Sequence, residues 1–155
     1  MASGDHLISA EGKSEAEAEL AHRREVRRPE IVAAIKVARE FGDLKENAEY
    51  HAAREEQGLN EARIRVLEHH LASATVGDES NGDLVAVGTR VSYRDDANGE
   101  TVSVTLVHPL EADLTSGKIS VDSPIARALR GNRKGDRVTL ETRRGAKTIE
   151  ILELG

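Results

Sequence analysis

Residues 38–50 read Ala38-Arg39-Glu40-Phe41-Gly42-Asp43-Leu44-Lys45-Glu46-Asn47-Ala48-Glu49-Tyr50 and separate two segments with helical periodicity. Upstream, apolar residues recur three and four positions apart, at Ile31, Ala34, Ile35, Ala38 and Phe41. Downstream, helical spacing predicts a second face made of Leu59, Ile64, Leu67, Leu71 and Ala74. Gly42 can end the first helix in a left-handed conformation, and Asp43 can begin the second. Helices joined by so short a turn run antiparallel, so this turn is the far end of a helical hairpin.

Acidic side chains gather at the turn, namely Asp43, Glu46 and Glu49, with Glu40 just before it. Asp43 and Glu46 have the spacing of a capping box with Asp43 as N-cap, and acids in a first helical turn suit the helix dipole. The same two carboxylates share a helix face and could hold part of the oxygen shell of a hard cation. Two ligands are too few for a protein-only Mg²⁺ site, so phosphate or another protein would have to complete it. Spacing alone leaves both interpretations open.

Composition limits the class of protein. The chain has 155 residues, which suffice for one ordinary domain or two small ones, and it contains no cysteine. The absence of disulfides, of a signal-peptide core and of any apolar run near ~20 residues predicts a cytoplasmic location and no membrane partner. Aromatic residues are limited to Phe41, Tyr50 and Tyr93. A ligand pocket or a base-stacking surface usually has more.

Charge is distributed unevenly along the chain. Residues 1–79 hold 17 acidic and 11 basic side chains, whereas residues 80–155 hold 11 of each, so the net charge of −6 lies in the first half. This balance argues against a general DNA-binding surface. Basic residues still cluster between Arg127 and Lys147, and again at Arg23, Arg24, Arg27 and Arg28. Such clusters form solvated faces or contacts for acidic protein or RNA phosphate.

The chain divides into two expected domains. Residues 1–77 form the hairpin, with its acidic tip at 42–50, and a second helix is expected at about 46–75. The segment 13–26 favours helix but has a thin apolar face of Ala16, Leu20 and Ala21. Pro29 predicts a kink near Arg28, or a fresh helix with Pro29 at its first position. Gly77 to Gly82 is turn-rich and marks the boundary.

Residues 78–155 have the pattern of a small α+β domain. Strands are expected at 84–87, 89–93, 101–108, 137–141 and 148–154. Asn98-Gly99 is a hairpin turn signal, and a second turn is expected at Arg144-Gly145. Ser123-Pro124 has the pattern of an N-cap followed by the first helical position, which predicts a short helix at 123–129. A few antiparallel strands with one short helix follow from this order.

Three stretches closely resemble the Gre-type transcript cleavage factors: Gly42 to Gly58 with the upstream Val26-Arg27-Arg28-Pro29-Glu30-Ile31, and the distant Ile119 to Leu129. The resemblance extends over most of the chain from about residue 7. It implies an N-terminal antiparallel coiled-coil hairpin followed by an FKBP-like antiparallel sheet with one short helix. The chain departs from the family at 13–26, where such factors usually carry more large apolar residues, so the base of the hairpin is expected to pack less tightly.

The resemblance also implies a function. Such factors bind bacterial RNA polymerase at its secondary channel and stimulate its own cleavage of the nascent RNA 3′ end in a backtracked complex. The globular domain docks at the channel rim, and DNA is contacted only indirectly, through the elongation complex. The factor is therefore not expected to be an enzyme alone or to hold a metal when free. A second Mg²⁺ is shared with the polymerase, whose own aspartates hold the first.

Residue by residue, Asp43 and Glu46 match the family's catalytic, metal-holding pair. Glu49 and Tyr50 match supporting residues of the tip. Arg39 and Arg54 flank the tip and could contact RNA phosphate, although pairing with Glu40 or Glu55 on the helix surface would explain them equally well. In the second domain, docking or the fold itself would account for a family signature at Ser123, Pro124, Ile125 and Ala126.

Three other functions remain as alternatives. A non-cleaving regulator of the same family would occupy the same channel without hydrolysis, which the intact Asp43 and Glu46 disfavour. A peptidyl-prolyl isomerase is disfavoured because Tyr93 is the only aromatic residue after residue 80. A structural coiled coil with an acidic tip and no chemistry would be the first choice without the resemblance.

Overall fold

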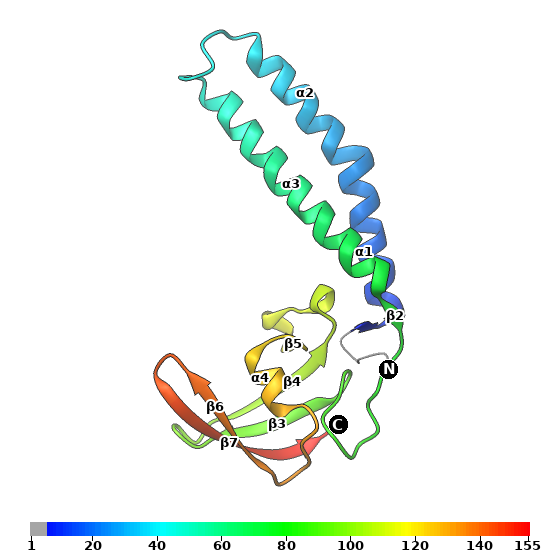
Figure 1. The fold of residues 1–155 in the computed structure, drawn as a ribbon, viewed down its shortest axis with the longest axis vertical. Coiled ribbons are helices and arrows are strands. Elements are labelled where there is room, and N and C mark those ends of the chain that lie inside the picture. The colour runs from blue at the N-terminus through cyan, green and yellow to red at the C-terminus, as the bar shows by residue number, and fades with distance from the viewer. Residues whose placement is uncertain (1–5) are drawn as a thin grey trace. The chain divides into compact units, whose positions relative to one another are not determined.

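A computed structural model of the chain describes residues 6–155 (Figure 1). These residues form two compact units, one comprising residues 13–73 and the other residues 6–12 together with 74–155. The expected domains, residues 1–77 and 78–155, differ from this division in two ways. The helical unit ends at residue 73, and residues 6–12 do not belong to it. Residues 6–12 group with the C-terminal unit because β1 (Leu7–Ile8) pairs in parallel with β2 (Thr75–Val76).

The helical unit is an antiparallel hairpin, as expected (Figure 1). Its first arm contains α1 (Ala10–His22), a π-helical segment η2 (Arg23–Arg27) and α2 (Arg28–Arg39), and its second arm is α3 (Ala48–Ser73). Pro29 lies in the first turn of α2, and the arm continues through η2 without an intervening loop. Proline has no N–H to donate to the preceding turn, and a wider π turn is one way a helix accommodates that missing donor.

A narrow seam joins the two arms of the hairpin. Near the tip, Ile31, Ile35 and Ala53 are buried together, with Tyr50 packed against them. Farther from the tip, α3 contributes buried Ile64 and Leu67. Three expected members of the apolar faces are exposed to solvent, namely Ala34, Phe41 (70% exposed) and Leu59 (66% exposed). Phe41 follows the end of α2, and the phase of α3 turns Asn60 into the seam in place of its neighbour Leu59.

The C-terminal unit contains a five-stranded sheet in the order β5-β4-β3-β7-β6. The strands are β3 (Arg90–Asp95), β4 (Thr101–Val107), β5 (Lys118–Ser120), β6 (Arg137–Thr142) and β7 (Gly145–Leu154). The sheet is mixed because β5 runs parallel to β4, so the expectation of a purely antiparallel sheet is wrong at this edge. Two 3₁₀ turns, η3 (Pro109–Glu111) and η4 (Leu114–Ser116), connect β4 to β5.

Local signals in this unit are largely confirmed. The short helix α4 (Pro124–Leu129) begins at Ser123, whose hydroxyl accepts the Ala126 N–H at 3.3 Å. Its buried Ala126 and Leu129 belong to the core of the sheet. The segment 84–87 is a loop, although a strand is expected there. Val85 and Val87 are nevertheless buried, and the N–H of Val85 donates to Asn132 O.

The fold class is therefore α+β, with a helical hairpin followed by a sheet and one short helix. Among residues 6–155, every helix falls short of the length and apolar character needed to span a membrane.

Candidate functional site at the hairpin tip

The turn between the arms begins with a frayed helix end. Beyond Arg39, the N–H groups of Glu40 and Phe41 donate to Val37 O and Ala38 O, both at 3.1 Å. Gly42 then adopts a φ of 107°, a region that a side chain disfavours. A glycine with positive φ therefore redirects the chain here, as the sequence predicts.

Asn47, not Asp43, caps the second arm. Asn47 Oδ1 accepts the Tyr50 N–H at 3.0 Å, and α3 accordingly starts at Ala48. Asp43 Oδ1 instead accepts the Lys45 N–H at 3.0 Å, which closes a local turn. The capping-box prediction for Asp43 and Glu46 is therefore wrong. Asn ranks with Asp as an N-cap residue, so Asn47 could have been found from its type and its place before Ala48.

The acidic residues of the tip are exposed and carry no ion pair. Among the described residues, Glu40, Asp43, Glu46 and Glu49 take part in none of the salt bridges, and all four are exposed. Along the arms, by contrast, several acids are paired, because Glu19, Glu56, Glu61 and Glu68 each contact an arginine of the first arm. The tip thus concentrates negative charge that the protein itself does not neutralise.

The predicted flanking residues differ in their surroundings. Tyr50 packs against the Ile31–Ile35–Ala53 cluster, and the Arg39 guanidinium lies 5.9 Å from its ring centroid. Neither Arg39 nor Arg54 forms an ion pair in residues 6–155, so the expected alternative of pairing with Glu40 or Glu55 is not formed. Both arginines are exposed, and Arg39 alone of the two lies over the tyrosine ring.

The donor atoms at the tip suit a hard cation but are few. Carboxylate oxygens are the ligands that Mg²⁺ prefers, and Asp43 and Glu46 provide them without competition from a nearby arginine or lysine ion pair. No group of three or more His, Cys, Asp or Glu side chains within residues 6–155 is placed to hold a metal. Asp43 and Glu46 by themselves would leave most of the coordination shell of such an ion unfilled.

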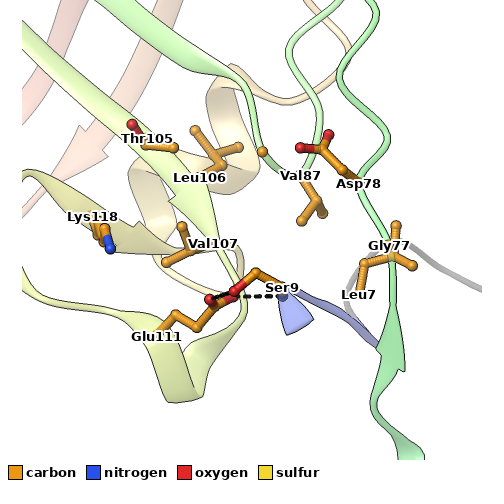
Figure 2. A pocket seen from close by; sticks show the side chains of 11 residues that line it. Leu7, Ser9, Gly77, Asp78, Val87, Thr105, Leu106, Val107, Glu111 and Lys118 are labelled. Atoms are coloured by element: carbon orange, nitrogen blue, oxygen red, sulfur yellow. Dashed lines mark hydrogen bonds between the residues drawn. The ribbon is translucent and has the colours of Figure 1, made fainter. Parts of the chain in front are cut away.

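The C-terminal unit has a pocket of about 240 Å³, lined in part by Ser9, Asp78 and Glu111 (Figure 2). The side chains of Ser9, Asp78 and Glu111 form hydrogen bonds within the fold. The Glu111 carboxylate accepts the N–H of Ser9 at 3.1 Å and also its hydroxyl, and Ser9 Oγ accepts the Gly12 N–H at 2.9 Å, which caps α1. Asp78 accepts the Ser80 N–H at 2.6 Å. The hydrogen bonds of Ser9 fix the start of α1. Because these polar side chains are already engaged, the hairpin tip is the stronger candidate site.

Comparison with known proteins covers the whole described chain. The family described as "Transcription elongation factor, N-terminal" matches residues 6–76, and the one described as "Transcription elongation factor, GreA/GreB, C-term" matches residues 77–155. The chain is 44% identical over 147 residues to transcription elongation factor GreA of Geobacillus kaustophilus, covering 94% of this chain and 93% of that one. It is 47% identical over 150 residues to GreA of Pseudomonas aeruginosa, covering 95% of each.

Among solved structures, the GreA factor homolog 1 (Gfh1) of Thermus thermophilus aligns with 31% identity and a TM-score of 0.44, over 96% of this chain and 97% of that one. The two family matches together account for all residues from 6 to 155. The chain therefore belongs to the GreA/GreB family of transcription elongation factors.

Proposed function

We propose that the chain binds bacterial RNA polymerase at its secondary channel and stimulates the polymerase's cleavage of the RNA 3′ end in a backtracked complex. The observation that carries this proposal is the unneutralised acidic tip. Asp43 and Glu46 are exposed at the end of a hairpin in which Glu19, Glu56, Glu61 and Glu68 on the arms pair with arginine, whereas none of the four tip acids does so within residues 6–155. Like charges gathered at one exposed point repel one another, and a cation brought by a second macromolecule would relieve that repulsion.

In this proposal Asp43 and Glu46 supply oxygen ligands to a second Mg²⁺, which the polymerase also binds. Such an ion neutralises charge on the scissile phosphate and lowers the pKa of an attacking water. The chain's own contribution is to bring two carboxylates to the site in a defined arrangement. Asn47 and Gly42 serve that end, because they set the path of the turn that carries both acids.

The neighbouring residues have supporting roles. Tyr50 packs on the seam and lies beneath Arg39, so it steadies the first turn of α3 that carries Glu49. Arg54 is exposed and is free to approach RNA phosphate, and Arg39 can do so from its position over the tyrosine ring. The chain alone catalyses nothing in this proposal, acts in the cytoplasm, and meets DNA only through the elongation complex.

The test uses purified bacterial RNA polymerase stalled in a backtracked complex with labelled RNA. The rate of RNA cleavage is measured with the wild-type chain, with Asp43→Asn, with Glu46→Gln and with the double variant, and polymerase binding is measured in parallel. Each single change is expected to lower the stimulated rate on the order of 10- to 100-fold with binding retained. Glu40→Gln is the matched control, because it neutralises an exposed acid outside the pair and should leave the rate unchanged.

Two results would contradict the proposal in different ways. Polymerase binding without any stimulation by the wild-type chain would remove the cleavage activity and leave a regulator that occupies the channel. Full stimulation by the double variant would show that the tip carboxylates do not take part.

A further inference from the structure

The seam of the hairpin contains one polar side chain that is almost completely buried. Asn60 is 4% exposed and lies on the same face of α3 as the buried Ala53, Ile64 and Leu67. Taking an amide out of water is unfavourable unless its donor and acceptor are both satisfied. Whether burial of Asn60 costs free energy therefore depends on the hydrogen-bond partners of its amide.

Both partners of Asn60 belong to a single residue of the opposite arm. Arg23 Nη1 donates to Asn60 Oδ1 at 3.0 Å, and Asn60 Nδ2 donates to the carbonyl oxygen of Arg23 at 3.2 Å. The same carbonyl accepts the Arg28 N–H, a bond between residues five apart. Asn60 is therefore hydrogen-bonded both to the main chain and to a side chain of the π-helical segment η2.

Two ion pairs that share Glu19 lie one turn farther from the tip. The Glu19 carboxylate accepts Arg23 Nε at 2.7 Å and accepts Arg63 Nε and Nη2 at 2.9 and 3.0 Å. These bonds, Arg63 first, lower the pKa of Glu19 to about 2. We call Glu19, Arg23, Asn60 and Arg63 the polar clasp. It lies in the part of the hairpin where the sequence has few large apolar residues.

Apolar packing around the clasp comes mainly from Ile64 and Leu67 of α3, and the first arm adds little to it there. The segment η2 contributes no buried residue, and several buried positions of the seam are alanines, namely Ala16, Ala38 and Ala53. The pairs Arg24–Glu68 and Arg27–Glu56 join long side chains that remain accessible to solvent and can exchange partners, whereas the bidentate pair Arg28–Glu61 adds to the alignment. A buried asparagine, by contrast, accepts only an alignment that satisfies its amide, which is how a single polar residue fixes register in coiled coils.

We propose that Asn60 is a positioning residue that fixes the register of α3 against the first arm and thereby sets where the hairpin presents Asp43 and Glu46. A slip by one helical turn would displace the arms by about 5.4 Å along their axis, which exceeds the tolerance of a metal-ligand geometry. The part of this proposal that concerns the register of α3 applies to the free protein alone. The part that concerns the placement of Asp43 and Glu46 rests on the proposed function.

The test compares Asn60→Leu with Gln57→Leu, which replaces an amide one turn away on the same helix that forms no hydrogen bond within residues 6–155. Because the chain has no cysteine, Val32→Cys and Val66→Cys place one exposed spin label on each arm without competing sites. Electron–electron double resonance then reports the distance between the arms. Cleavage is measured at saturating and at limiting concentrations of the factor.

We expect one narrow distance in the unsubstituted chain and in Gln57→Leu. Asn60→Leu should give a broadened distribution, or a second population displaced by about 5 Å, while its helix content and unfolding midpoint stay equal or rise. Its maximal rate of cleavage should fall about tenfold or more at an unchanged half-saturating concentration. If Asn60→Leu loses helix content, Asn60→Ala, which removes the same hydrogen bonds, is measured in its place.

A single unshifted distance in the Asn60 variant would overturn the register proposal. A displaced distance together with undiminished cleavage, in an assay in which Asp43→Asn does slow cleavage, would overturn the positioning role. If instead Asp43→Asn leaves cleavage unchanged while the Asn60 variant shows the displacement, the proposed function fails and the effect of Asn60 on register stands.

Discussion

Asn47 donates a hydrogen bond from its side-chain nitrogen to the carbonyl oxygen of Ala38 at 2.7 Å. Ala38 lies in the last turn of α2, whereas Asn47 immediately precedes α3 and caps it through its side-chain oxygen. One amide thus closes the turn across nine residues: it caps the free Tyr50 N–H of α3 and adds a second donor to Ala38 O, which already accepts the Phe41 N–H. The acids at 43 and 46 lie within the loop that it closes.

This relationship predicts that Asn47→Ala lowers the free energy of unfolding of the helical unit by about 1–2 kcal/mol, because both the cap and the bridge are lost. Asn47→Asp separates the two effects, since a carboxylate can cap α3 but cannot donate to Ala38 O. Denaturation followed by circular dichroism should place the aspartate variant between wild type and alanine. Stimulated cleavage should fall in both variants although Asp43 and Glu46 are intact. Equal stability of all three proteins would contradict this account.

The two arginines that flank the tip are predicted to differ. Arg39→Ala should destabilise the helical unit by about 0.5–1 kcal/mol, because the guanidinium loses its contact with the Tyr50 ring. Arg54→Ala should change stability by less than about 0.5 kcal/mol, because no ring or ion-pair partner is found for it within residues 6–155. If both contact RNA, both variants slow cleavage, and Arg54→Lys restores part of the rate. Chemical denaturation measures the stability of each variant, and the cleavage assay measures its rate. An Arg39→Ala variant that is as stable as wild type but inactive would show that the ring contact contributes little to stability.

The clasp residue Glu19 predicts a pH dependence. Its pKa falls from 4.5 to about 2 on folding, chiefly through the hydrogen bonds from Arg63. A carboxylate whose pKa is lowered by folding stabilises the protein fully above its unfolded pKa and loses that contribution as pH falls through the folded value. The unfolding midpoint of wild type should therefore exceed that of Glu19→Gln above about pH 4.5, and the two should converge near pH 2. A difference that persists unchanged to pH 2 would exclude this titration.

Two leucines of the C-terminal unit form a matched pair. Leu129, on α4, is 0% exposed, and Leu114, in the 3₁₀ turn η4, is 83% exposed. Leu129→Ala should destabilise this unit by about 2–5 kcal/mol, because it leaves a cavity beneath the sheet. Leu114→Ala should alter stability by less than about 0.5 kcal/mol. Thermal unfolding of the two variants measures both values, and similar losses would contradict the packing described for α4.

Much of the candidate site follows from sequence because it depends on short-range chemistry. The positive φ of Gly42 and the exposure of Asp43 and Glu46 are local properties of a turn between two periodic segments. The capping box was a wrong prediction because Asp43 and Asn47 are both good cap residues. The choice between them depends on Ala38 O, a partner on the other arm.

The sequence suffices to predict the helical hairpin, its antiparallel course, the cap at Ser123 and the turn at Asn98-Gly99, since each depends on residues a few positions apart. Three other features become known only from the folded chain: β1 pairs with β2, β5 runs parallel to β4, and Asn60 in place of Leu59 faces the seam. These features join residues far apart in the chain, and their free energies depend on burial and on hydrogen-bond partners that exist only once both segments are in place.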